Sequence, residues 1–245
     1  MGDVFGVQIP PAIQTLMDRV QRITGQSVQF IKTQQDGFVE ASRIENQTPM
    51  IWLRDPSGIA LYAIAHGLLH LDCETSGFPR TRTLSRSHHK NMLLSELNSL
   101  VEHQVIFPKL HQLGFSPEQE MVTLFQTNFI PRLSDLVPFA SRLPRTRQLF
   151  LAVRYAQLRL ETPNGDVRAT VETWYQNQAG QERQAGQQLE SIIRSADVDN
   201  PTQYQTALFA CIHSLGCTEL ELQYQVFVPF PHPSSRVENH QTESL

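Results

Sequence analysis

The spacing of apolar residues along the chain predicts a mixture of helices and short strands. From Pro10 to Gly25 apolar residues recur every three or four positions, which is typical of an amphipathic helix, with prolines at its start and a glycine at its end. Three short β-like stretches follow at 27–32, 37–44 and 50–53, separated by the turn-forming sequences QQDG and ENQTP. They predict a small antiparallel or mixed sheet, arranged as a meander.

The next segments predict two more helices with a loop between them. Asp55 is suited to cap a helix that begins at about Pro56 and runs to Glu74. Residues 80–90, RTRTLSRSHHK, are polar and basic, so we expect an exposed loop there that can serve as a binding or gating element. A leucine and valine pattern then predicts a third helix, which ends at Pro108.

The second half of the chain is mainly helical in its pattern. Ser116-Pro117-Glu118 predicts another helix start. Strict alternation between 220 and 228 predicts a strand that pairs with an earlier one. The expected class is therefore α+β, with one unit at 1–115, a mainly helical region packed on it at 116–230, and a disordered tail at 231–245. The further helices are expected at about 145–161, 166–177, 181–196 and 201–215.

Composition and charge exclude several classes of protein. The chain has 245 residues, of which 40% are apolar and 18% charged, so it can bury a substantial core. A net charge of -4 argues against a nucleic-acid partner bound through bulk charge. No apolar run approaches the roughly 18 residues of a membrane span, and the first residues lack a signal-peptide pattern. With three scattered cysteines, the chain reads as a cytoplasmic protein without a disulfide framework.

Two histidines in the second helix are the strongest candidates for chemistry. His66 and His70 are four residues apart, so they lie on one face of the helix, about 6 Å apart at Cβ. That spacing lets both imidazoles reach one metal ion. The helix around them is apolar on nearly every side, which indicates that it is buried. The alternative is a pair of core histidines that hydrogen-bond to backbone carbonyls or carboxylates.

The segment AHGLLHLDCETSGFP, following a helix and a short three-stranded sheet, resembles the zincin-type metallopeptidases, particularly the small ImmA/IrrE-type ones. The resemblance covers roughly residues 10–115. It implies a zinc ion bound by His66 and His70, with a carboxylate on the following helix as the third ligand. It also implies that a glutamate general base belongs at the position after the first histidine.

Gly67 stands at that general-base position. Glycine cannot accept a proton from a metal-bound water, and such a proton transfer is worth typically about 10²- to 10⁴-fold in rate. Glu74 lies on the same helical stripe as the histidines, but it is two turns from Gly67, so it is a weak candidate for a relocated base. No catalytic residue is therefore assigned.

The third helix offers three candidates for the third metal ligand. Its apolar stripe is centred near Leu97, and Glu96 and His103 flank one edge of that stripe, which favours these two. Glu102 points furthest from the stripe. The resemblance to the metallopeptidases favours Glu102 or His103 instead, because Asn98-x-x-x-Glu102-His103 is similar to the helix that accompanies such histidine motifs. The third ligand is thus Glu102, Glu96 or His103.

These observations predict a degenerate zinc metallopeptidase-like protein that binds a peptide or protein partner. The resemblance implies that an edge strand beside the histidine helix aligns the bound chain, and we expect Met50 to Leu53 to be that strand. One alternative is an active zinc peptidase with a relocated base. Another is a metal-free interaction or structural protein. We expect neither a nucleic-acid nor a membrane partner, and the sequence leaves the oligomeric state open.

Overall fold

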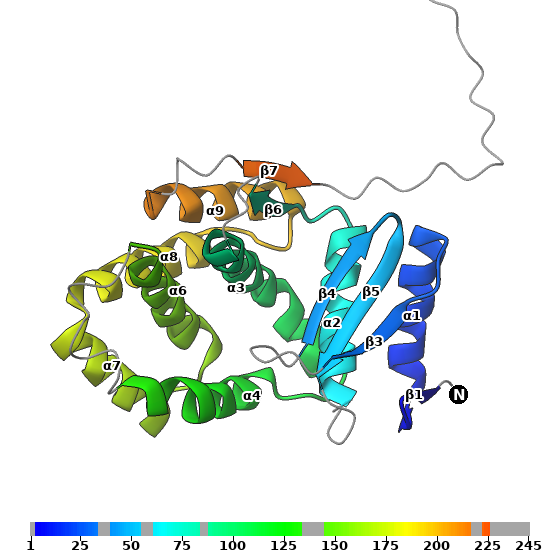
Figure 1. The fold of residues 1–245 in the computed structure, drawn as a ribbon, viewed down its shortest axis with the longest axis horizontal. Coiled ribbons are helices and arrows are strands. Elements are labelled where there is room, and N and C mark those ends of the chain that lie inside the picture. The colour runs from blue at the N-terminus through cyan, green and yellow to red at the C-terminus, as the bar shows by residue number, and fades with distance from the viewer. Residues whose placement is uncertain are drawn as a thin grey trace, which may run out of the picture.

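The protein has an α+β fold, shown by a computed structural model that describes residues 3–33, 40–54, 61–83, 88–133, 145–216 and 222–225 (Figure 1). Small sheets and three helices occupy the N-terminal half, and helices dominate the C-terminal half. The first half contains β1 (Asp3–Val4), β2 (Val7–Gln8), α1 (Pro11–Thr24), β3 (Gln29–Thr33), β4 (Glu40–Glu45), β5 (Thr48–Arg54), α2 (Leu61–Thr75), β6 (Arg80–Thr83) and α3 (His88–Gln112). The second half contains α4 (Pro117–Leu124), the π-helix η2 (Phe125–Phe129), the 3₁₀ helix η3 (Ile130–Arg132), α6 (Arg145–Glu161), α7 (Asp166–Gln178), α8 (Gly180–Ser195), α9 (Pro201–Ser214) and β7 (Leu222–Gln225).

The three-stranded sheet is mixed and has the order β3-β5-β4. β3 runs parallel to β5, and β4 runs antiparallel to it. The expected meander is therefore wrong, because a meander would place the strands in chain order. The expectation that Met50 to Leu53 form an edge strand is also wrong, because they lie in β5 and are paired on both sides. In this sheet β4, not β5, is the edge strand that contacts α2.

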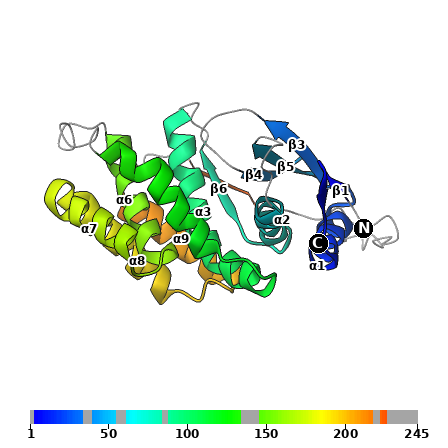
Figure 2. The same ribbon diagram turned by 90° about the horizontal axis from the view of Figure 1, so that it is seen from below.

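Helices α1 and α2 cover one face of this sheet (Figure 2). The face that they cover carries Ile51 and Leu53 of β5, whose side chains are fully buried. α1 ends where the sequence predicts, because Gly25 adopts a left-handed φ of 70° that closes the helix. Asp72 connects α2 to two other helices. Its buried carboxylate pairs with Arg19 of α1 at 3.0 Å and with Lys109 of α3 at 3.1 Å.

α2 is buried along nearly its whole length, as its apolar sequence predicts. Its predicted start at Asp55 and Pro56 lies outside the described residues. α3 continues to Gln112, so the predicted end at Pro108 is wrong. Proline removes one helical hydrogen bond, but Leu110 is fully buried in the turn that follows, and the contact of Lys109 with Asp72 holds that turn in place.

The expected exposed loop at 80–90 is wrong wherever the structure describes it. Arg80–Thr83 form strand β6, and α3 already begins at His88. The side chain of Asn98 in α3 pairs with the backbone of Thr81 on both sides, accepting from its N–H at 3.0 Å and donating to its carbonyl at 2.8 Å. These basic and polar residues form a strand because they have partners elsewhere in the fold.

The strand predicted near the C-terminus forms β7 and pairs antiparallel with β6. The pairing joins Arg80 to Gln225 and Thr83 to Leu222, so the returning strand meets an earlier one as expected. The predicted tail at 231–245 lies outside the described residues.

The C-terminal helices agree closely with the predicted ranges, and α6 spans the same residues as predicted, 145–161. α3 lies between the sheet-bearing part and this helical part, with α2 on one side and α6 on the other (Figures 1 and 2). α6 and α8 pack along each other. Within the described residues, none of the helices is both long and apolar enough to cross a membrane.

Gly186 allows the close packing of α8 on α6, which gives a first prediction. A Cβ at Gly186 would lie 2.6 Å from the carbonyl oxygen of Ala152 and 2.9 Å from Tyr155. We expect Gly186→Ala to lower the free energy of unfolding by about 1–3 kcal/mol, because the helices must move apart. Urea unfolding followed by circular dichroism measures this change.

The matched control is Gly180→Ala, in the same helix. A Cβ at Gly180 meets nothing within 4 Å, so this change should raise stability by about 0.4–1 kcal/mol. Equal effects of the two substitutions would contradict the packing described for Gly186.

Candidate metal centre

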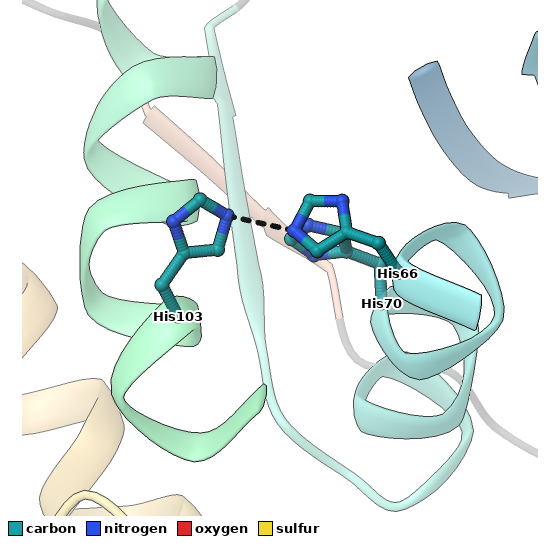
Figure 3. Close-up of side chains that lie close together, drawn as sticks. All are labelled: His66, His70 and His103. Atoms are coloured by element: carbon teal, nitrogen blue, oxygen red, sulfur yellow. Dashed lines mark hydrogen bonds between the residues drawn. The ribbon is translucent and has the colours of Figure 1, made fainter. Parts of the chain in front are cut away.

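Three histidines from two helices meet in the interior of the protein. α2 supplies His66 and His70, and α3 supplies His103. One ring nitrogen of each lies within 4.8 Å of the other two (Figure 3). The Nε2 atoms of His66 and His103 are 3.1 Å apart, and their imidazoles face each other between the two helices. These three residues therefore lie close enough to hold a metal ion.

The geometry of the cluster suits a small transition-metal ion. In a tetrahedral zinc site with metal–nitrogen distances near 2.0–2.1 Å, two ligand nitrogens lie about 3.3 Å apart. The distance of 3.1 Å between His66 and His103 is close to this value. His70 and His103 are 4% and 6% exposed, while His66 is partly exposed. Three protein ligands are typical of catalytic rather than structural zinc sites.

Glu102 lies beside Nδ1 of His70. Its Oε2 is 3.0 Å from Nδ1 of His70. When Nδ1–H donates to this carboxylate, Nε2 of His70 carries the lone pair that a metal ion needs. Glu102, one of the three expected ligands, is thus placed as a partner of a histidine, and it does not belong to the cluster of possible ligand atoms.

Glu161 plays the same part for His103. Its Oε1 lies 3.0 Å from Nδ1 of His103, and the carboxyl group is completely buried. Sequence reasoning did not identify Glu161, because it lies 58 residues away in α6, in the region read only as packing helices. Two of the three imidazoles thus contact a buried carboxylate through Nδ1. Such carboxylate–histidine pairs commonly orient the ligands of zinc sites and fix their tautomers.

The carboxylate of Glu102 is held in its charged form. Burial alone would raise the pKa of Glu102, but the positive charge of Arg80 and the contact with His70 outweigh burial and lower that pKa from 4.5 to about 2. Arg80 donates to Oε2 of Glu102 from Nε at 3.2 Å and from Nη2 at 2.9 Å. A charged carboxylate is the stronger acceptor for the Nδ1–H of His70.

The buried charges around the cluster also fit a divalent cation. The carboxyl groups of Glu74, Glu102 and Glu161 are all buried, and Arg80 is the guanidinium that contacts the first two. Counted as ionised groups, these residues carry three negative charges and one positive charge. A divalent ion bound by three neutral imidazoles supplies two positive charges, which makes the region neutral.

A direct hydrogen bond between His66 and His103 is the metal-free alternative. At 3.1 Å the two Nε2 atoms are within hydrogen-bond distance. Because Glu161 accepts from Nδ1–H of a neutral His103, Nε2 of His103 is the acceptor and His66 must carry its proton on Nε2. In a metal site the same His66 nitrogen carries a lone pair. The two states thus differ in the tautomer of His66.

Aromatic contacts also orient the rings of the cluster. Tyr62 stacks on His66 with ring centroids 5.6 Å apart and planes inclined by 10°. Phe107 stacks on His103 at 5.0 Å and 23°. Both aromatic residues come from the helices that carry the histidines, four residues before His66 and four after His103, so the helical repeat itself aligns them.

The other expected site residues lie apart from the cluster. Glu96 pairs with Arg154 of α6 at 2.7 Å. Gly67 is buried in α2, directly after His66. Glu74, the weak candidate for a relocated base, has Oε2 3.9 Å from Nη1 of Arg80. His103 is the candidate from the third helix that the structure brings together with His66 and His70.

Comparisons of the chain with known proteins give no match. No protein-family model matches it, no curated protein matches it, and no solved structure matches it. The resemblance to the zincin-type metallopeptidases therefore depends on the residues of this chain and on their order alone.

Proposed function

We propose that the chain is a zinc-binding, metallopeptidase-like protein that has lost its catalytic glutamate and binds a peptide or protein partner at the metal centre. His66, His70 and His103 would be the zinc ligands. Glu102 and Glu161 would hold the ligands His70 and His103 in place.

One observation carries this proposal, namely the convergence of three imidazoles, two of which contact a buried carboxylate through Nδ1. Two core histidines can arise by chance in a buried helix, but this arrangement requires residues from α2, α3 and α6. An all-imidazole donor set suits zinc, copper, iron or nickel better than magnesium or calcium, which prefer oxygen ligands. We propose zinc because the histidine spacing and the order of elements resemble those of the zincins.

Zinc held by these three histidines would polarise a bound carbonyl group and would lower the pKa of a bound water to about 7. Peptide hydrolysis also needs a group that takes the proton from this water and delivers it to the leaving amine. Gly67 has no side chain to do so, and Glu74 faces Arg80. Binding of a peptide carbonyl does not require the proton transfer, so binding can persist without hydrolysis.

The edge strand β4 supports the proposal of an extended peptide partner. β4 contacts α2, and the strand order leaves one of its edges unpaired within the described sheet. An extended chain can add to such an edge through backbone hydrogen bonds. We propose that β4 aligns the bound chain, in place of the expected strand Met50 to Leu53.

Restoring the missing glutamate tests the functional proposal. We expect the zinc-loaded wild-type protein to hydrolyse no peptide, and the Gly67→Glu variant to gain weak peptidase activity, because a carboxylate then follows the first zinc ligand. A general base is worth typically about 10²- to 10⁴-fold, so the gain should be measurable with a fluorogenic peptide mixture. The zinc content of each variant is measured in the same samples.

The control for this experiment is Gly67→Gln, which has nearly the same size but cannot act as a base. It should remain inactive. Hydrolysis by the wild-type protein that disappears in His70→Ala would instead identify an active peptidase with a relocated base. An inactive Gly67→Glu variant with a full complement of zinc would contradict the idea that one missing residue separates this protein from a peptidase.

A further inference from the structure

The guanidinium of Arg80 joins three elements around His70. It is carried by β6 and donates to Glu102 of α3 from two nitrogens, at 2.9 and 3.2 Å. A third nitrogen, Nη1, donates to the carbonyl oxygen of Ser42 in the edge strand β4 at 3.0 Å. Nη2 also lies 3.1 Å from Nδ1 of His70 in α2.

The contacts form a triangle that can exist in two hydrogen-bonding states. The corners are Nδ1 of His70, Oε2 of Glu102 and Nη2 of Arg80, with sides of 2.9 to 3.1 Å. In one state Nδ1–H donates to Oε2, and Nε2 of His70 carries the lone pair. In the other state Nη2 donates to Nδ1, and the proton of the ring is on Nε2, where it prevents metal binding.

The position of the guanidinium favours the first state. Both of its short contacts with Glu102 go to Oε2, the same oxygen that lies beside Nδ1. They fix that oxygen in the place where it accepts from His70. A charged acceptor makes the stronger hydrogen bond, so Nδ1 keeps its proton.

The strand that carries Arg80, β6, contacts both α3 and β7. Its neighbour Thr81 is bonded to the side chain of Asn98 in α3, and β6 pairs with β7 along its whole length. Arg80 is therefore carried by backbone that is fixed relative to α3. This placement is more than charge neutralisation requires, because a flexible lysine or arginine could also neutralise Glu102.

We propose that Arg80 is a positioning residue of the metal centre, which fixes Glu102 on the Nδ1 side of His70 and thereby keeps His70 in the tautomer that binds a metal ion. This inference rests on the proposed function, because it concerns the affinity of the same site. It adds a specific cause for that affinity, located in a residue that does not contact the ion.

The test compares the zinc affinity of wild-type protein, Arg80→Gln and Arg80→Lys, measured by competition with a chromophoric chelator. Arg80→Gln should bind zinc about 10- to 100-fold more weakly, as expected when the orientation of a ligand is lost. Arg80→Lys keeps the charge but not the planar fork, so its affinity should fall between the two. The visible absorption spectrum of the cobalt(II) form should change in Arg80→Gln, because it reports how the ligands surround the ion.

Arg154→Gln is the matched control. Arg154 is 20% exposed and pairs with Glu96 of α3, whereas Arg80 is 17% exposed and pairs with Glu102 of the same helix. Loss of the Arg154 pair should leave zinc affinity and the cobalt spectrum unchanged, even where it lowers stability. Urea unfolding of the metal-free variants separates a loss of stability from a loss of affinity.

Wild-type affinity and an unchanged cobalt spectrum in folded Arg80→Gln would overturn the inference while leaving the metal centre intact. If Arg80→Gln does not fold, the zinc affinity of Arg80→Lys is the test. A wild-type affinity in this variant would overturn the inference. A lower affinity in a folded Arg80→Lys protein would support it. A wild-type protein that binds neither zinc nor cobalt would instead refute the proposed function, so the two failures are distinguishable.

Discussion

We expect the replacement of any one of His66, His70 or His103 by alanine to abolish tight zinc binding. Each substitution would remove one of the three proposed protein ligands, and the two remaining imidazoles would not enclose the ion. The zinc affinity should fall by more than the factor of about 10 to 100 that is typical when a ligand loses its carboxylate partner. Zinc titration in the presence of a competing chelator measures the affinity, and circular dichroism shows that each variant remains folded.

His111→Ala is the control for these substitutions. His111 also lies in α3, but its side chain is 50% exposed and pairs with Glu118, away from the cluster. Its removal should leave zinc binding unchanged. Undiminished binding in His103→Ala would assign the third ligand elsewhere, and the sequence would then point to Glu102 or Glu96.

Removal of the metal should lower the thermal stability of the protein markedly. An ion that binds only the folded chain stabilises it by about 4 kcal/mol when its free concentration is 1,000 times the dissociation constant. For a protein of this length, about 2–4 °C of melting temperature correspond to each kcal/mol. We therefore expect a chelator to lower the Tm by about 10 °C. Differential scanning calorimetry with and without added zinc measures the change.

The physical reason is the charge distribution of the buried site. Without the ion, three buried carboxyl groups lie around the cluster: Arg80 contacts Glu74 and Glu102, and Glu161 contacts His103. In His70→Ala the chelator should have no further effect, because the ion is already absent. A chelator that leaves the wild-type Tm unchanged would indicate that the folded protein does not depend on a metal.

The local pattern of the sequence predicts much of the fold. Helical periodicity and capping residues identify the helices of the second half, and α6 has the predicted bounds of 145–161. The arrangement of the strands is not predicted. β3 and β5 are direct neighbours in the sheet and run parallel, although β4 comes between them in the chain. Chain order favours a meander, whereas the parallel pairing joins two strands that are not consecutive in the chain.

The strand β6 shows a second limit of sequence reasoning. Arg80 and Thr81 are polar, and polar runs are typical of loops. In the structure the partners of these residues are Glu102 and Asn98, which follow 22 and 17 residues later in the chain. A partly buried basic residue cannot be told from an exposed one until its partner is located.

The sequence also predicts only part of the candidate site. The spacing of His66 and His70 is visible in one helix, so the sequence predicts that the two rings share a face. The choice among Glu96, Glu102 and His103 depends on the rotation of α3 relative to α2, which periodicity alone leaves open. Glu161 carries no local signal, because its role depends on how α6 packs against α3.

The most direct test of the three-histidine centre is the metal content of the full chain, measured by elemental analysis after purification without chelators or a nickel column. We expect about one zinc ion per chain in the wild-type protein and none in His103→Ala, as for a site with three protein ligands. A wild-type protein that takes up no zinc, even after zinc is added, would contradict this expectation, and the three histidines would then be a hydrogen-bonded part of the core.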